Sequence, residues 1–194
     1  DVYKRQVDKL GANLDMLQAN VAKISEIRQQ GPARAIEITA AQFSSAAAAI
    51  GKIKDTYSLS VRGVSIAALE DIAADTHVSG IGVVDTSDNI ASNLDLLQSY
   101  GVKLLSAAST DKAPLSVTAE QVQADALALG KIYRGYQLNV RSATLADLAS
   151  LRKNDKVKRI EVEDTAENVA RNLNALKRLG NTLTSIKITD PDND

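Results

Sequence analysis

The chain repeats part of its own sequence at a fixed offset, and this repeat limits the possible folds more than any other feature. Residues 83–97 read VVDTSDNIASNLDLL, and residues 162–176, which lie 79 positions later, read VEDTAENVARNLNAL. When residues 51–101 are placed over residues 130–180 without gaps, 20 of the 51 positions are identical. A fixed period of this length is typical of proteins in which one supersecondary unit recurs along the chain.

A partial third copy extends the repeat towards the N-terminus. The phrase NLDMLQ at 13–18 resembles NLDLLQ at 93–98, and ITAAQ at 38–42 resembles VTAEQ at 117–121. The pattern predicts these segments: the end of a preceding module at 7–30, and whole modules at 35–110 and 114–190.

The chain begins with a segment that does not belong to the repeat. Residues 1–6, DVYKRQ, are what the DNA GATGTGTATAAGAGACAG encodes, and this DNA resembles a transposase adapter used to prepare sequencing libraries. We therefore expect this tail to be adapter-derived and the sequence to be a fragment of a longer protein. Segments of this kind are left out of fold prediction.

Short strands with alternating apolar and polar residues recur inside each copy. They read AIEIT, SLSVR, GIGVVD, PLSVT, QLNVR, RIEVED and SIKITD, with their apolar positions beginning at Ile36, Leu59, Ile81, Leu115, Leu138, Ile160 and Ile186. An alternation of this kind predicts strands with one buried face and one face in water.

Helices are predicted between the strands. Threonines stand at the expected N-caps: Thr39, Thr86, Thr118, Thr144 and Thr165. Apolar residues at helical spacing follow two of them, namely Ile90, Leu94 and Leu97 in one copy and Val169, Leu173 and Leu176 in the next. Gly101 and Gly180 stand where a C-terminal glycine cap is expected.

These elements predict an α/β fold made of tandem β-α-β-α-β-α-β modules. Strand–helix–strand connections of this length favour parallel pairing with right-handed crossovers. The alternating strands favour a two-layer, solenoid-like arrangement, with a mostly parallel sheet and helices on one face. The links near GPAR and TDKAP are too short for a parallel crossover, so either the modules form separate sheets or the array bends at each link.

The phrases VVDTSDNIASNLDLL, VEDTAENVARNLNALKRLGNTLTSIKITD, VTAEQVQADALALGKI and LNVR resemble a repeat of very large bacterial proteins, mainly from alphaproteobacteria. These are described as repeat-containing, adhesin-like or haemolysin-type calcium-binding proteins. The resemblance covers almost all of residues 7–190 and implies a secreted or cell-surface location with a scaffold or adhesive role. The chain lacks the glycine–aspartate nonapeptides of calcium-roll segments and has only 10 glycines, which puts calcium binding in doubt.

Composition excludes several classes of function. Lys plus Arg number 23 and Asp plus Glu 24, so no net positive field is available to hold nucleic acid. No apolar run approaches the roughly 20 residues needed to span a membrane, so we expect no membrane insertion. The absence of cysteine excludes disulfides, thiol catalysis and cysteine metal sites.

The candidate metal and catalytic residues are few. Asp190, Asp192 and Asp194 place carboxylates at alternate positions, which is a weak calcium pattern without a glycine or a distal glutamate, and a turn is the expected structure. His77 is the only histidine, its counterpart is Lys156, and we expect a solvated loop residue. A single histidine without partners argues against a hydrolase triad, so we expect no enzyme and no cofactor.

Other residues recur with the module. Asp85 and Asp164, like Arg62 and Arg141, lie at strand ends, where loop residues of parallel sheets often bind or react, although a structural role explains their recurrence better. Asn13, Asn93 and Asn172 recur inside predicted helices despite their low helix propensity. We expect these amides to be half-buried and to tie helix to loop or to the neighbouring module, and Asn168 to be a neutral control.

The sequence therefore favours a non-enzymatic structural or adhesive repeat of a large secreted or cell-surface bacterial protein, with neighbouring copies of the repeat as its partners. The alternative is a module that binds a surface protein or glycan through its exposed sheet face, which would carry Glu37, Ser60, Asn139, Glu161 and Lys187.

Overall fold

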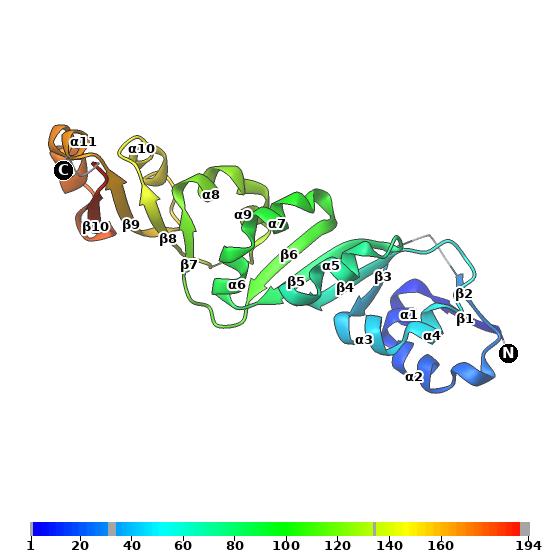
Figure 1. The fold of residues 1–194 in the computed structure, drawn as a ribbon. Coiled ribbons are helices and arrows are strands. Elements are labelled where there is room, and N and C mark those ends of the chain that lie inside the picture. The colour runs from blue at the N-terminus through cyan, green and yellow to red at the C-terminus, as the bar shows by residue number, and fades with distance from the viewer. Residues whose placement is uncertain (1, 31–33, 134, 191–194) are drawn as a thin grey trace. The chain divides into compact units, whose positions relative to one another are not determined.

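The structure is a computed structural model that describes residues 2–30, 34–133 and 135–190, which form an α/β fold (Figure 1). The strands form a two-stranded sheet, β1-β2, and two four-stranded parallel sheets, β3-β4-β5-β6 and β10-β9-β8-β7. The strands are β1 (Val2–Gln6), β2 (Glu26–Gln30), β3 (Ile36–Thr39), β4 (Leu59–Val64), β5 (Val78–Asp85), β6 (Leu104–Ser109), β7 (Leu115–Thr118), β8 (Leu138–Ala143), β9 (Val157–Asp164) and β10 (Leu183–Ile188).

The helices between the strands are short and often come in pairs. The α-helices are α1 (Val7–Ala12), α2 (Leu14–Ala19), α3 (Ala40–Ser45), α4 (Ala47–Ile50), α5 (Ile66–Ala74), α6 (Ser87–Ser92), α7 (Leu94–Ser99), α8 (Ala119–Ala124), α9 (Ala126–Lys131), α10 (Leu148–Leu151), α11 (Ala166–Arg171) and α12 (Leu173–Lys177). The 3-10 helices are η1 (Val21–Lys23), η2 (Gly101–Lys103) and η3 (Gly180–Thr182). Among the described residues, no helix has the length and apolar character needed to cross a membrane.

The two four-stranded sheets share strand order and register. Ile36 of β3 lies opposite Leu59 of β4, and Leu115 of β7 lies opposite Leu138 of β8, which is the same pairing 79 residues later. The strands alternate in burial, with β3 following the order buried, exposed, buried, exposed. Helix α3 packs against β3 and β4, and α8 packs against β7 and β8. The apolar core therefore lies between one sheet face and the crossover helices.

Each sheet has the same irregularity on its second strand. The register of β4 against β5 shifts between Arg62 and Val64, and the register of β8 against β9 shifts between Val140 and Ala143. Gly63 has φ of 70° and its counterpart Ser142 has φ of 51°, which is a conformation that a non-glycine residue rarely adopts. This bulge interrupts the pairing just after Arg62 and Arg141, which lie inside β4 and β8 and not at the strand ends where the sequence placed them.

Several boundaries differ from the predicted ones. Strands β5 and β9 begin at Val78 and Val157, three residues before the expected apolar positions, because backbone pairing starts before the clean alternation does. Thr144 does not cap a helix. Its backbone N–H and its hydroxyl both donate to Asp147 Oδ2, at 2.9 Å and 2.8 Å, and this closes a turn that delays α10 until Leu148.

The chain divides into two compact units, and one segment of the second unit is inserted in sequence between two parts of the first. The first unit comprises residues 1–85 and 100–108, and the second comprises residues 86–99 and 109–194. The pair α6–α7 therefore belongs to the second unit, although it connects β5 to β6 of the first. Of the two arrangements that the short links allow, the structure has separate sheets.

Each unit contains a contact between a helix pair and the strand and helix pair that follow it in sequence. In the first unit, α1 packs against β3 and α2 against α4, and we call this the first junction. In the second unit, α6 packs against β7 and α7 against α9, and we call this the second junction. The helix pairs of these junctions are thus shared between consecutive parts of the chain.

Candidate functional site

The outward face of the β7–β10 sheet carries polar side chains in register, and we call it the polar face. Ser116, Asn139 and Arg159 occupy paired positions on β7, β8 and β9. Arg141 lies opposite Thr118, and Glu161 lies opposite Ser185 of β10. Because residues at these positions alternate with buried ones, regular parallel pairing brings their side chains together on one surface.

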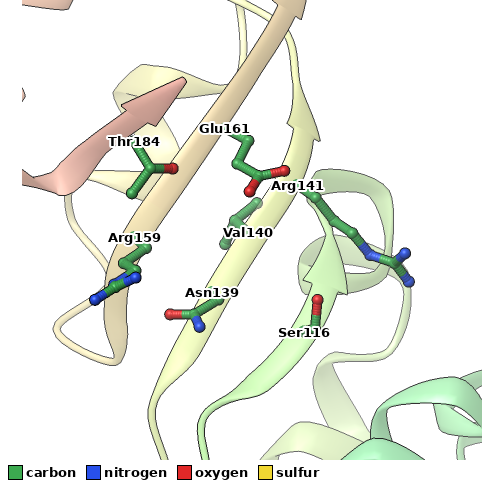
Figure 2. Close-up of a pocket in the computed structure, with 7 residues that line it drawn as sticks. All are labelled: Ser116, Asn139, Val140, Arg141, Arg159, Glu161 and Thr184. Atoms are coloured by element: carbon green, nitrogen blue, oxygen red, sulfur yellow. The ribbon is translucent and has the colours of Figure 1, made fainter. Parts of the chain in front are cut away.

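A hollow of about 150 Å³ lies on the polar face. Its lining residues are Ser116, Asn139, Val140, Arg141, Arg159, Glu161 and Thr184. Figure 2 shows Arg141 and Arg159 extending away from each other on opposite sides of the hollow, with Glu161 and Asn139 between them. The hollow is thus bordered by positive charge on two sides and has a carboxylate between the two arginines.

Most of the polar groups around the hollow are free to bind a ligand. Within the described part of the chain, the side chains of Arg141, Arg159 and Glu161 form no hydrogen bond or ion pair. The Thr184 hydroxyl donates to the Ile160 carbonyl at 3.1 Å. Guanidinium groups suit carboxylates and other planar oxyanions, and the amide of Asn139 can donate or accept. The arrangement fits recognition of a polar, partly anionic surface group.

Lys187, which the sequence also places on this face, is already paired. Its Nζ donates to Glu163 Oε1 at 2.7 Å, and the two residues lie opposite each other on β10 and β9. This bond is the main reason why the pKa of Glu163 is lowered from its ordinary value. Lys187 therefore neutralises a neighbour and contributes little free charge to the hollow.

The corresponding face of the first unit has different chemistry. Glycines Gly80 and Gly82 of β5 stand where β9 has Arg159 and Glu161, and the side chain of Leu105 lies over Gly80. Arg62 Nη1 lies 3.7 Å from Glu37 Oε2, whereas Arg141 has Ser116 at the corresponding place. Of the two sheet faces that the described residues form, only the polar face therefore carries arginine side chains without a partner.

Asp85 and Asp164 have the same structural role. Asp85 Oδ2 accepts from the backbone N–H of Ile66, and Asp164 Oδ2 accepts from that of Leu145, both at 2.8 Å. The Leu145 N–H is the main cause that lowers the pKa of Asp164, followed by the Asn168 amide. Each carboxylate holds the loop that follows the preceding strand.

The calcium candidate Asp190 also has a structural partner. Its Oδ2 accepts from the Ala166 N–H at 3.0 Å, just as Asp111 accepts from the Ser87 N–H and hydroxyl, at 3.2 Å and 2.6 Å, one copy earlier. Asp192 and Asp194 lie outside the described residues. In the part that the structure describes, no three His, Cys, Asp or Glu side chains are grouped to hold a metal ion.

His77 stacks on an aromatic ring in a surface loop. Its ring lies parallel to that of Tyr57, with centroids 4.4 Å apart, and its Nδ1 lies 3.0 Å from Asp75 Oδ1. One copy later, Lys156 lies over the ring of Tyr136 at 5.8 Å. The position therefore holds a flat or cationic group against a tyrosine in both copies.

The recurring threonines and asparagines shape the helix pairs. Thr86 and Thr165 are N-caps that accept from the N–H of Asn89 and Asn168 at 3.2 Å, as their positions in the sequence predict. Each recurring asparagine lies at the break between the two short helices of its pair. Their side-chain amides all donate to the carbonyl four residues earlier: Asn13 to Lys9, Asn93 to Asn89 and Asn172 to Asn168.

These partners differ from the expected ones. The amides close the end of their own helix and contact neither a loop nor a neighbouring module in these bonds. Asn13 and Asn93 are half-buried, but Asn172 is exposed. Asn168, the expected neutral control, donates Nδ2 to Asp164 Oδ1 at 2.7 Å, so its replacement would remove a bond to a nearly buried carboxylate.

Glutamines at the two junctions make contacts that sequence reasoning missed. Gln18 Oε1 accepts from the Ala49 N–H in the first junction, and Gln98 Oε1 accepts from the Ala128 N–H in the second, both at 2.9 Å. In the other direction, the capping-box glutamines donate to helix carbonyls: Gln42 to Gly11 at 3.3 Å and Gln121 to Ala91 at 3.4 Å. The signal was available, because these glutamines end the very phrases that the partial third copy shares.

One buried carboxyl in the second junction was also missed. Asp125 stands at the break between α8 and α9, is 2% exposed, and its Oδ2 has no hydrogen-bond partner among the described residues. Burial raises its pKa to about 6, and Asp95 and Glu120 add to the shift. The counterpart of Asp125 in the first junction is Ala46, so comparing the two similar segments does not predict an ionisable group at this position.

Comparisons with known proteins do not assign the chain to a family. No protein-family model matches it, and no curated protein or solved structure is significantly similar to it.

Proposed function

We propose that this chain is a non-enzymatic structural segment of a tandem, solenoid-like array in a large secreted or cell-surface bacterial protein, where it serves as a stalk, spacer or adhesive scaffold. The observation that carries the proposal is the pair of junctions. In each, a helix pair is packed against the strand and helix pair that follow it, with matching glutamine hydrogen bonds. The secreted or surface location rests on the sequence resemblance.

Shared helix pairs favour an array over independent domains. Ile90, Leu94 and Leu97 are fully buried, although they lie on helices that connect two strands of the first unit while belonging to the second. A module that ends at its last strand would leave its successor without this apolar cover. Repeat proteins gain stability from such nearest-neighbour interfaces as copies are added.

Fragments test the proposal. Residues 114–194 lack α6 and α7, whereas residues 86–194 retain them. We expect the shorter fragment to melt at a lower temperature than the longer one, and both to melt below the full chain in circular dichroism. Equal melting points for 114–194 and the full chain would instead indicate independent beads and would overturn the array.

The alternative function is binding of a surface protein or glycan through the polar face. The specific observation that favours it is the hollow bordered by the unpaired Arg141 and Arg159. A glycan array with acidic and neutral members tests this alternative. Acidic glycans should bind the chain and bind the Arg159→Ala variant at least tenfold more weakly, while the Arg62→Ala variant in the first unit should bind normally.

A further inference from the structure

The helix pair α11–α12 presents an apolar face that is open to solvent. Leu173 is 60% exposed, whereas its counterparts Leu14 and Leu94 are 1% and 0% exposed. Ala170 is also exposed, although its counterpart Ala91 is buried. The same residue types at the same helical positions are therefore covered in two helix pairs and uncovered in the third.

The two covered pairs show what covers this position. In the first junction, α1 and α2 pack against β3 and α4, and in the second, α6 and α7 pack against β7 and α9. The covering element is in both cases a strand, a capping-box threonine and glutamine, and an alanine-rich helix pair. Among the described residues, no strand or helix packs on α11 or α12 in a comparable way.

We propose that the face formed by Ala170, Leu173 and Lys177 binds a further strand–helix-pair unit of the same kind as residues 112–133. This inference rests on the proposed function, because it identifies the next partner of the array. The bound unit buries Leu173 as Leu94 is buried, and its capping-box glutamine donates to the Ala170 carbonyl as Gln121 donates to that of Ala91.

One residue makes this third face different from the others. Gln18 and Gln98 accept a backbone N–H from the covering helix pair, but the corresponding position holds Lys177, whose ammonium group cannot accept a hydrogen bond. The bound unit would leave that N–H without its usual acceptor. Lys177→Gln should therefore strengthen the contact, which gives the proposal a gain-of-stability test.

The experiment extends the chain by one unit. A copy of residues 112–133 is joined directly after Asp190, because Asp190 occupies the place of Asp111 in the copy before. Urea denaturation is then measured for the parent and extended chains, each with Leu173→Ala, with Lys177→Gln and without substitution. Val102→Ala is the control, since Val102 is 90% exposed and lies elsewhere.

In the extended chain, Leu173→Ala should lower the denaturation midpoint about as much as Leu94→Ala does, and Lys177→Gln should raise it. In the parent chain, both substitutions should leave the midpoint nearly unchanged. Val102→Ala should have no effect in either chain. Methyl signals of Leu173, followed by nuclear magnetic resonance, should shift when the unit is added.

Equal effects of Leu173→Ala in the parent and extended chains, with unshifted Leu173 methyl signals, would overturn the proposal. This failure is distinguishable from failure of the array itself. If residues 114–194 still melt below the full chain, the array stands and only the assignment of this face falls. If they melt equally, the array proposal falls by its own test.

Discussion

The first and second junctions use the same arrangement of elements, and two of the differences between their sequences change the spacing and the charge. Both place a helix pair on a strand and a second helix pair, and both have the reciprocal glutamine bonds from Gln18 and Gln42 or from Gln98 and Gln121. These bonds all end on backbone groups, so they fix the approach of the elements without depending on neighbouring side chains. The comparison shows which contacts the two junctions have in common and which residues differ between them.

The difference between Gly11 and Ala91 changes how closely the elements approach, and the difference between Ala46 and Asp125 adds a charged group. A Cβ added to Gly11 would overlap the backbone carbonyl oxygen of Glu37, yet its counterpart Ala91 has a methyl group and is 3% exposed. Ala46 of the first junction is replaced by the buried Asp125 in the second. The helix therefore approaches the strand more closely in the first junction than in the second. The second junction contains a buried carboxyl at a position where the first has only a methyl group.

The largest expected effect concerns this close approach. Gly11→Ala should lower the free energy of unfolding by about 3 kcal/mol, because the contact is with backbone and no side chain can yield. The matched Ala91→Gly change should cost only about 1.5 kcal/mol, which is the helix-propensity difference plus the loss of one buried methyl group. Urea denaturation of both variants measures the difference. Similar costs would mean that the two junctions are equally spaced.

The next effect concerns pH. The pKa of Asp125 is raised from its ordinary value of 3.8 to about 6 in the folded chain. Between these two pH values the folded chain keeps the proton on Asp125, whereas the unfolded chain has released it. The contribution of this group to stability is therefore fully present below about pH 4 and is lost as the pH rises through about 6. The change in the free energy of unfolding caused by Asp125→Ala should therefore be about 2 kcal/mol more stabilising at pH 8 than at pH 4.

The first junction provides the reverse control for this effect. Ala46→Asp places a carboxyl at the matching break, where Asp15 accepts from Gln42 Nε2 at 3.1 Å. This variant should gain a pH dependence like that of the parent second junction. Denaturation curves at pH 4 and pH 8 measure both changes. A pH-independent effect of Asp125→Ala would show that Asp125 is ionised at no cost.

A smaller effect concerns the glutamine acceptor of the second junction. Gln98→Met keeps the side-chain length but leaves the Ala128 N–H without its partner, which should cost about 1–2 kcal/mol. Gln98→Glu retains an acceptor and should recover most of the loss. If Gln98→Met and Gln98→Glu are equally stable, the bond contributes nothing and the junction is held by apolar contact alone.

The smallest effect concerns the recurring asparagines. Asn93 donates to Asn89 from a half-buried position, so Asn93→Ala should cost about 1 kcal/mol. Asn172 makes the same bond at 2.9 Å but is exposed, and water can replace its partner, so Asn172→Ala should be nearly neutral. Thermal melts of the two variants would separate them, and a costly Asn172→Ala would contradict this account.

Much of the fold could be read from the residues themselves. The alternation of Ile36 and Ile38, or of Leu115 and Val117, predicts strands buried on one side, and these four side chains are buried. The capping boxes of Thr39 and Thr118 form as their spacing predicts, because both partners lie within one helical turn. Local chemistry of this range needs no knowledge of the rest of the chain.

The candidate sites were harder to predict because their partners are distant in sequence. Asp190 was a calcium candidate by spacing, but its carboxylate accepts from Ala166, 24 residues away. A helical wheel predicts that Asn168 is neutral, because the wheel shows the apolar stripe but not the carboxylate of Asp164 that Asn168 contacts. The sequence predicts some residues of the polar face, such as Asn139 and Glu161. It does not predict the hollow, because the free charges there depend on which side chains form ion pairs across neighbouring strands.

The alternation, the caps and the similarity of phrases 79 residues apart can be read directly from the residues, because they depend on contacts within one strand or one turn, or on the order of residues alone. Which surfaces are covered depends on packing between elements that are distant in the chain. Leu94 and Leu173 are the same residue in the same phrase, and one is buried while the other is 60% exposed. Burial is a property of what packs against a helix, and the helix itself does not encode it.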